Sequence, residues 1–160
     1  MSADELRRQT FNRAIKLLTI KPRSVAELRR RLLQGKNANK TVVETVIARL
    51  EEYGYLNDER FAFGYASLKV KQRPVGRRRL QRDLKLKQVS NNVAEEALEL
   101  VYADTPEEQL IDAAIEKRIR VRGRPQTRVE AKKLFDHLLR QGFEFELVSE
   151  KVRALFDPSC

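Results

Sequence analysis

The chain has 160 residues, of which 41% are apolar and 35% are charged. This is enough apolar material for a folded core, and it excludes the profile of a wholly disordered chain. Lysine and arginine number 33 against 23 aspartate and glutamate residues, which gives a formal net charge of +10. The positive excess indicates a polyanionic partner, whether DNA, RNA, a nucleoprotein or an acidic membrane face.

Targeting and membrane-spanning segments are not expected. No apolar run reaches the roughly 18 residues that a transmembrane helix needs. The N-terminal sequence Met-Ser-Ala-Asp-Glu-Leu lacks the basic and apolar regions of a signal peptide. The single cysteine, Cys160, has no intramolecular partner for a disulfide. We therefore expect a cytoplasmic monomer without a membrane partner.

The N-terminal third of the chain predicts three helices. Apolar residues at helical spacing predict the first over residues 7–20, and Pro22 stops it. Ser-Val-Ala-Glu at 24–27 and Thr-Val-Val-Glu at 41–44 match the capping box, in which a hydroxyl and a carboxylate each satisfy an orphan backbone N–H. They predict the starts of the second and third helices, and the third should end at 53–55. The predicted buried faces are Leu28, Leu32 and Leu33 in the second helix, and Val42, Val43, Val46, Ile47 and Leu50 in the third.

Six more helices are predicted over the rest of the chain. The fifth follows Pro-Val-Gly at 74–76, and the eighth ends at Gly142. The predicted N-caps are Asp58 for the fourth helix, Ser90 for the sixth and Thr105 for the seventh. The predicted apolar faces, from the fourth helix to the ninth, are Phe61, Phe63, Tyr65 and Leu68; Leu80 and Leu84; Val93, Ala97, Leu98 and Val101; Leu110, Ile111, Ala114 and Ile115; Val129, Leu134, Leu138 and Leu139; and Leu147, Val148, Val152 and Leu155.

The predicted helices fall into three groups of three, which indicates a duplicated module of about 50 residues. The second helices of the groups show the correspondence: Leu28 and Leu32 match Leu80 and Leu84, and then Leu134 and Leu138. Chance similarity among amphipathic helices is the alternative explanation. A module of this size buries little core by itself, so neighbouring modules should pack through their helices.

We therefore predict an all-α fold of three tandem three-helix repeats, each like a helix-turn-helix unit, that form an elongated or curved row. The predicted bounds are 7–56 for the first repeat, after a short N-terminal segment, 57–104 for the second and 105–157 for the third. Residues 158–160 are predicted to be a tail. The joints between the repeats are the expected places of bending.

Charge is segregated into blocks along the chain. Residues 69–87 carry nine basic side chains against one acid, and residues 117–133 carry eight against one. Between them, residues 88–116 carry eight acids and no lysine or arginine. Mixed charges would cancel within a Debye length of about 8 Å, whereas blocks of one sign on separate helices create a lasting local field. This pattern favours a binding surface for a polyanion.

Catalytic and metal sites are not expected. His137 is the only histidine, so a metal cluster of histidines is impossible, and its place between Leu134 and Leu138 favours a structural role. Neither phosphate-binding glycine motif is present. Carboxylates that could suggest a nuclease lie at predicted helix N-termini, where capping and the helix dipole explain them. They are Asp58, Glu59, Asp104, Glu107 and Glu108. We expect no enzyme activity and no cofactor or metal.

Aromatic side chains cluster between the first and second predicted repeats. They are Tyr53, Tyr55, Phe61, Phe63 and Tyr65. Packing of the joint is the favoured role. The alternative is stacking on unpaired bases, which is worth about 1–3 kcal/mol per base.

Four stretches of the chain carry a family resemblance. They are Ser-Val-Ala-Glu-Leu-Arg-Arg-Arg-Leu-Leu at 24–33, Gly-Tyr-Leu-Asn-Asp-Glu-Arg-Phe-Ala at 54–62, Gly-Arg-Arg-Arg-Leu-Gln-Arg-Asp-Leu at 76–84 and Leu-Leu-Arg-Gln-Gly-Phe at 138–143. Together they resemble the RecX family of bacterial recombination regulators over roughly residues 11–156, and the second stretch is the most specific. The chain departs from the family at 72–76, where Gln-Arg-Pro-Val-Gly replaces a frequent Gly-Tyr-Gly-Pro.

The resemblance implies a non-catalytic regulator of homologous recombination and DNA repair in the SOS response. Members of the family bind the RecA filament on single-stranded DNA, lodge in its helical groove, and inhibit its ATPase and strand exchange. The implied partners are therefore the RecA filament and single-stranded DNA, with double-stranded DNA as a further candidate. The alternative function is a stand-alone nucleic-acid-binding repeat protein without a recombinase partner, because three-helix units resemble helix-turn-helix domains.

The basic helices are expected to make this contact. Arg78, Arg82 and Lys85 are spaced i, i+4, i+7 and share one helical face, on which arginine forks could match phosphate oxygens. The alternative is a solvated face that is balanced by the acidic helix beside it. The full set of candidate recombinase- or DNA-binding residues is Arg29, Arg30, Arg31, Arg77, Arg78, Arg79, Arg82, Lys85, Arg128, Lys132 and Lys133.

Overall fold

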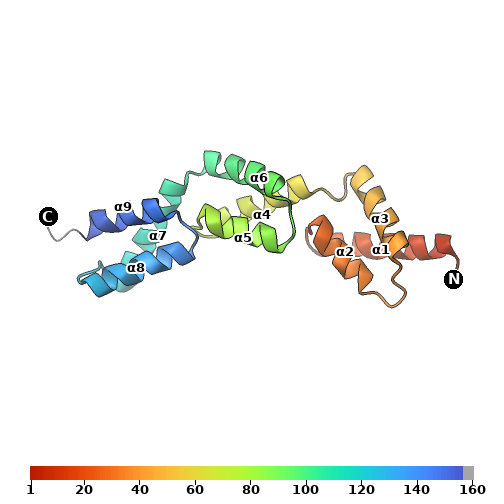
Figure 1. The fold of residues 1–160 in the computed structure, drawn as a ribbon, viewed down its shortest axis with the longest axis horizontal. Helices are drawn as coiled ribbons and strands as arrows, with labels where there is room; N and C mark the ends of the chain where they lie inside the picture. The colour runs from red at the N-terminus through yellow and green to blue at the C-terminus, as the bar shows by residue number, and fades with distance from the viewer. Residues whose placement is uncertain (157–160) are drawn as a thin grey trace. The chain divides into compact units, whose positions relative to one another are not determined.

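The computed structural model describes residues 1–156, and every regular element in that range is an α-helix (Figure 1). The prediction of an all-α fold is therefore confirmed. The predicted tail at 158–160, which includes Cys160, lies outside the described residues. The helices of the described range are α1 (Ala3–Ile20), α2 (Val25–Leu33), α3 (Lys40–Glu52), α4 (Asp58–Gln72), α5 (Arg77–Leu86), α6 (Asn91–Asp104), α7 (Glu107–Arg122), α8 (Arg128–Arg140) and α9 (Phe145–Leu155).

The chain divides into two compact units. The first unit comprises Met1–Ala62 with Leu84–Ala94, and the second comprises Phe63–Asp83 with the chain from Glu95 onward. The unit boundaries pass through α4, α5 and α6. The units therefore differ from the three predicted repeats, whose bounds stay a prediction.

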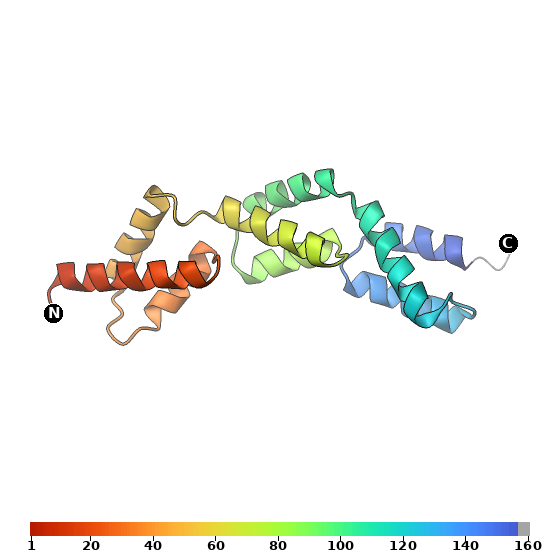
Figure 2. The same ribbon diagram turned by 180° about the vertical axis from the view of Figure 1, so that it is seen from behind.

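The core of the first unit lies among α1, α2 and α3, which pack against one another (Figures 1 and 2). Leu28 and Leu32 of α2 are buried with Ala14 of α1 and with four residues of α3, as the spacing predicts. Leu33 is 40% exposed, so its predicted burial is wrong. It follows Leu32 by about 100° of helical turn, which carries it past the buried face. Helix α1 begins before the predicted Arg7, at Ala3, because the Ser2 hydroxyl caps its first turn.

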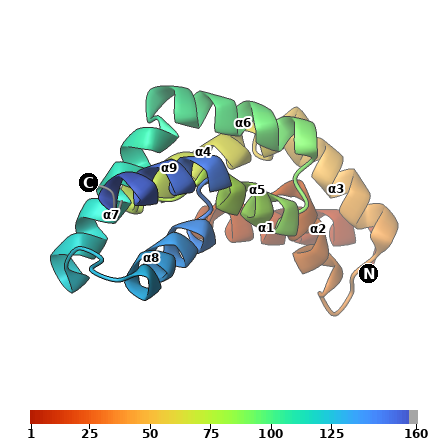
Figure 3. The ribbon, with the colours of Figure 1, turned by 60° about the vertical axis from the view of Figure 1, so that its left-hand side comes forward.

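The core of the second unit includes the packed helices α7, α8 and α9 (Figure 3). The four apolar residues predicted for α7 are all buried, as are Leu134 and Leu138 of α8. Phe143, in the turn between α8 and α9, is also completely buried. The predicted burial of Val129 is wrong, because Ala131 occupies the inward side of α8 and a residue two positions away faces about 200° from it.

The buried face of α4 is narrower than the sequence suggests. Phe63 and Leu68 are exposed, so their predicted burial is wrong. The buried residues of this helix are Phe61, Ala62, Ala66 and Val70. Small alanines let neighbouring backbones approach closely, and the packing of α4 follows their spacing rather than the size of its aromatic residues.

Two predicted N-caps are confirmed. The Ser24 hydroxyl accepts from the Glu27 N–H (3.1 Å), and the Glu27 carboxylate accepts from the Ser24 N–H (3.1 Å), which completes the capping box of α2. The Ser90 hydroxyl accepts from the Val93 N–H (3.4 Å) at the start of α6. Both seryl side chains therefore satisfy an orphan donor in the first turn of a helix.

Three other predicted N-caps, Thr41, Asp58 and Thr105, are wrong. Each is displaced by a neighbour that starts the helix at a different position. Asn39 accepts from the Val42 N–H (3.1 Å) at α3, and Asn57 accepts from the Arg60 N–H (3.0 Å) at α4. Pro106 precedes the first residue of α7 without a side-chain cap bond.

Two carboxylates in the first turns of α4 and α7 accept hydrogen bonds from earlier helices. Asp58 accepts from the backbone N–H of Val25 at the start of α2 (2.8 Å), and Glu107 accepts from that of Arg77 at the start of α5 (3.2 Å). Asp58 of α4 thus stabilises the positive N-terminal end of α2. Glu107 of α7 does the same for α5. This bond fixes the N-terminus of the basic helix α5.

Two turns also contact these N-termini. The turn after α5 contacts the start of α2, and the turn after α8 contacts the start of α5. The Ser24 hydroxyl donates to the carbonyl of Lys87 (2.7 Å), and the Gly76 N–H donates to the carbonyl of Gln141 (2.8 Å). Gln88 and Gly142, one residue further on in each turn, both have a positive φ, of 58° and 94°. Ser24 and Gly76 stand four residues before the matched Leu28 and Leu80, so the correspondence seen in the sequence extends to these contacts.

Candidate polyanion-binding surfaces

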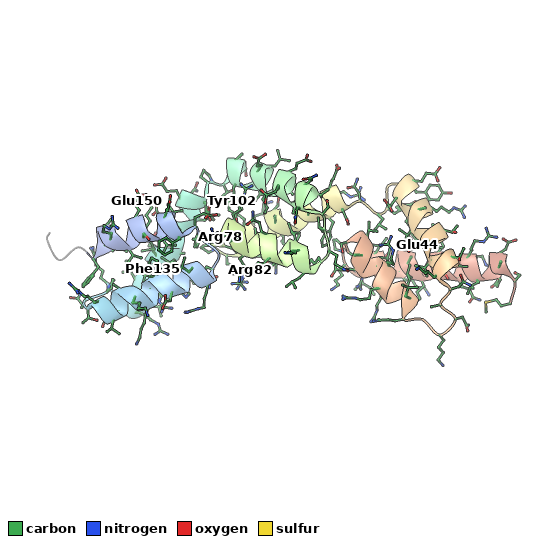
Figure 4. All side chains as sticks on the ribbon, viewed as in Figure 1. Glu44, Arg78, Arg82, Tyr102, Phe135 and Glu150 are labelled. Atoms are coloured by element: carbon green, nitrogen blue, oxygen red, sulfur yellow. The ribbon has the colours of Figure 1, made fainter. Side chains whose placement is uncertain are left out.

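Helix α5 presents the densest set of candidate residues. Leu80 and Leu84 are completely buried and fix which side of the helix faces the protein. Arg78, Arg82 and Lys85, which the spacing places on the opposite side, are all exposed. Arg82 points away from the ribbon into solvent, and Arg78 lies one turn before it (Figure 4). The helix therefore exposes three cations along one face.

The other two arginines of α5 are half-buried and take part in packing. Arg77 forms an ion pair with Glu95 (2.7 Å), and Arg79 donates to the side-chain carbonyl of Gln141 (3.1 Å). The same Glu95 carboxylate accepts from Gln81 (2.6 Å), and the Arg77 guanidinium and this amide hold the pKa of Glu95 below its ordinary value. Arg77 and Arg79 are thus tied to α6 and to the turn after α8.

The exposed cations of α5 differ in how far the protein neutralises them. Arg78 forms an ion pair with Glu144 (3.1 Å), which leaves more than half of its side chain exposed. Within residues 1–156, Arg82 and Lys85 form no ion pair. These two are therefore the charges of α5 that remain most available to an external anion.

The candidate residues of α2 divide in the same way. Arg29 makes a two-bond contact with the carboxylate of Glu44 on α3, at 2.7 and 3.3 Å. Arg30 and Arg31 are exposed and form no ion pair in the described part of the chain. The predicted alternative, a basic face balanced by the next helix, therefore holds for Arg29 but not for its two neighbours.

The three candidates of α8, Arg128, Lys132 and Lys133, are all exposed. None of them has a carboxylate partner among the described residues. Glu130 is the one acid among residues 117–133, and its carboxylate accepts from the backbone N–H of Gln126 (2.7 Å). The first two turns of α8 therefore carry cations that no described carboxylate pairs with.

A group of cations on α7 belongs to the basic block at 117–133 but was not among the candidate residues predicted from the sequence. Lys117, Arg118 and Arg122 line a groove of about 310 Å³ with His137 and with Arg73 from the segment after α4. The sequence did contain a signal, because Arg118 and Arg122 are four residues apart and share a face of α7. What it could not show is that His137, on another helix, lies beside them.

The aromatic residues between α3 and α4 are partly solvent-exposed. Tyr53 packs edge-to-face against Phe11 (6.4 Å between ring centroids) and Tyr55 (6.1 Å), and Arg49 lies over the first two rings. Tyr53 and Tyr55 are 52% and 57% exposed, whereas Phe61 is buried. Phe61 therefore packs inside the protein as predicted, and the two tyrosines keep ring surface open to solvent.

The described residues contain neither a cluster of metal-ligating side chains nor a helix that could span a membrane. Residues 1–156 contain no group of three or more His, Cys, Asp or Glu side chains that could hold a metal ion. No helix described here is both long and apolar enough to span a membrane. What the described side chains offer is exposed positive charge on separate helices, which suits contact with an extended polyanion.

Comparisons with known proteins agree with this arrangement. Residues 11–50 match the family model of the first three-helix domain of RecX, and residues 57–98 match that of the second. The chain is 30% identical over 153 residues to the regulatory protein RecX of Prosthecochloris aestuarii, which covers 96% of this chain and 97% of that protein. It is 32% identical over 139 residues to that of Bacillus subtilis, of which it spans 52%.

Solved structures show the same fold. A crystal structure of RecX from Lactobacillus salivarius superposes with a TM-score of 0.80 at 21% identity and covers 93% of this chain and 96% of that one. A second crystal structure, of a regulatory protein RecX, gives a TM-score of 0.81 at 16% identity over 95% of this chain and 73% of that one. The resemblance predicted from the sequence is confirmed, and the chain belongs to the RecX family of regulatory proteins.

Proposed function

We propose that this chain is a regulator of homologous recombination that binds the RecA filament on single-stranded DNA and inhibits its ATPase and strand-exchange activities. Membership of a family of regulatory proteins supports a role without catalysis. The observation that carries the proposal is the exposed basic face of α5, where Arg82 and Lys85 form no ion pair in the described range. Arginine and lysine in this setting bind phosphates and carboxylates through charge-assisted hydrogen bonds.

The remaining candidate residues extend the proposed contact along the chain. Arg30 and Arg31 of α2, and the three exposed cations of α8, are the further members whose charge the described protein leaves unneutralised. Arg29, Arg77 and Arg79 act in the proposal as supports that fix the basic helices against α3, α6 and the turn after α8. A filament presents both DNA phosphates and acidic protein surface, and each of these basic faces offers cations to one or the other.

Binding to coated and naked DNA tests this proposal. A fluorescent single-stranded oligonucleotide is titrated with the protein, with and without RecA and a slowly hydrolysed ATP analogue, at about 50 and about 200 mM salt. We expect RecA-dependent affinity that persists at the higher salt. Equal binding to naked and coated DNA, with a loss of about 300-fold or more between the two salt concentrations, would instead identify a stand-alone nucleic-acid-binding protein that contacts six or more phosphates of a single strand.

A further inference from the structure

A positively charged groove runs along α7 and α8, apart from the face of α5. Its volume is about 310 Å³, and four of its lining residues are lysine or arginine. None of the described residues that line it is acidic. An adjoining hollow of about 380 Å³ shares Arg118 and Arg122 with the groove and adds Lys133 and the single acid Glu130. The arginine pair therefore borders two neighbouring hollows.

Among residues 1–156, none forms an ion pair with the four cations that line this groove. The Arg118 guanidinium lies 3.5 Å from Nδ1 of His137 rather than beside a carboxylate. Burial lowers the pKa of Arg118, and Arg122 and Arg140 lower it further. Burial also lowers the pKa of His137, followed by the charges of Arg118, Arg140 and Arg122. Both groups therefore lie in a positive field that an anion in the groove would relieve.

We propose that this groove binds consecutive phosphates of a single-stranded nucleic-acid backbone. The proposal rests on the proposed function for its choice of single-stranded DNA as the ligand. A strand fits better than a mononucleotide because the arginine pair lines two neighbouring hollows, which could each take a phosphate of the same strand, and guanidinium forks match phosphate oxygens. Val121, which lines the groove and is 75% exposed, offers an apolar surface to a sugar or base.

Paired charge-removal variants test the groove in the absence of RecA. R118Q/R122Q removes the shared arginines, whereas R120Q/R124Q removes two exposed arginines from the same stretch that do not line either hollow. Binding of a fluorescent oligothymidylate is followed by anisotropy over a range of salt. We expect the groove variant to bind about tenfold more weakly and its salt slope to fall by about 1.4, which is two phosphate contacts on a single strand. The control variant should keep a slope close to that of the unmodified protein.

The imidazole of His137 gives an independent readout, because it is the only histidine in the chain. The charged groups that face it are Arg73, Lys117, Arg118, Arg122 and Arg140. In the untagged protein, NMR titration of this ring should show a shifted resonance and a raised pKa when oligothymidylate is added. A His137 resonance and pKa that DNA leaves unchanged would overturn the proposal, as would equal losses of affinity in the two variants. Neither measurement uses RecA, so failure of the filament assays above would leave these results intact.

Discussion

Gly76 and Gly142 touch backbone to backbone at the start of α5. The Gly76 N–H donates to the carbonyl of Gln141 (2.8 Å), and the Arg78 N–H donates to the carbonyl of Gly142 (3.1 Å). A Cβ on Gly76 would overlap the backbone of Gly142 and Phe143, and a Cβ on Gly142 would overlap the backbone of Arg79. The turn between α8 and α9 therefore satisfies first-turn donors of α5, and only glycine permits the approach.

The variant G76A should lose stability because its methyl group has no room against this backbone. We expect the free energy of unfolding to fall by about 1–3 kcal/mol, measured by urea denaturation. G64A is the matched control, since Gly64 lies within α4 and a Cβ there would meet no atom within 4 Å. That variant should gain about 0.5–1 kcal/mol. Equal stability of G76A and the unmodified protein would show that the turn after α8 does not contact α5 as described.

Ser24→Ala should destabilise the first unit. The Ser24 side chain is completely buried, accepts from the Glu27 N–H and donates to the carbonyl of Lys87. Loss of both bonds should lower the free energy of unfolding by about 1–2 kcal/mol. The exposed cap Ser90, whose hydroxyl bond is 3.4 Å long, is the comparison, and S90A should have a smaller effect. The reverse order of the two losses would contradict the role given to Ser24.

Two substitutions of Glu107 separate its charge from its hydrogen bond. Burial raises the pKa of this carboxyl above its ordinary 4.5, despite the bond it accepts from the Arg77 N–H. The folded protein therefore favours the protonated carboxyl of Glu107. Its contribution to the free energy of unfolding is complete below about pH 4.5 and is lost as the pH rises through the folded-state pKa. E107Q, which keeps an acceptor, should flatten this dependence, and E107A should destabilise by about 1–2 kcal/mol because Arg77 loses its acceptor. Thermal melting at several pH values measures both effects, and identical pH profiles for E107Q and the unmodified protein would refute the assignment.

His137 should make the protein less stable in mild acid. Its pKa is lowered from 6.5 by burial and by neighbouring arginines, so the unfolded chain binds the proton more tightly than the folded protein does. Stability should consequently be complete above pH 6.5 and decline as the pH falls through that value. H137Q should show a smaller decline in melting temperature between about pH 7.5 and 5.5. An equal or steeper decline in H137Q would contradict a lowered pKa for this ring.

Local patterns in the sequence predicted most of the core but fewer of the helix caps. Leu80 and Leu84 are completely buried because helical periodicity fixes the side of α5 that faces the protein. The roles of Asp58 and Glu107 could not be predicted, since their acceptor bonds join residues 33 and 30 positions apart. Any local rule assigns such a carboxylate to its own helix, and only tertiary packing shows that it serves another.

The candidate surfaces were predictable to the extent that charge follows helix periodicity. The exposed side of α5 follows directly from the spacing of Arg78, Arg82 and Lys85. The ion pair between Arg77 and Glu95 could not be predicted, because it depends on how α5 packs against α6. The groove of α7 and α8 was missed for the same reason, since Arg118 and His137 are 19 positions apart and the fold brings them together.

Charge reversal on α5 removes the proposed filament contact with least disturbance to the core. The variant R78E/R82E/K85E reverses the exposed face, and R82E/K85E repeats the test while it keeps the ion pair between Arg78 and Glu144. The control K16E/K36E/K40E reverses three exposed lysines of the first unit that are outside the candidate set. Circular dichroism should show the same helicity and cooperative melting for all of these variants.

The most direct measurement is the rate of ATP turnover by RecA on single-stranded DNA with increasing amounts of each protein. We predict that the unmodified chain and the lysine control suppress turnover at similar concentrations, and that both α5 variants have lost this suppression. Suppression by the α5 variants at the same concentrations as the unmodified chain would contradict the claim that this basic face engages the filament.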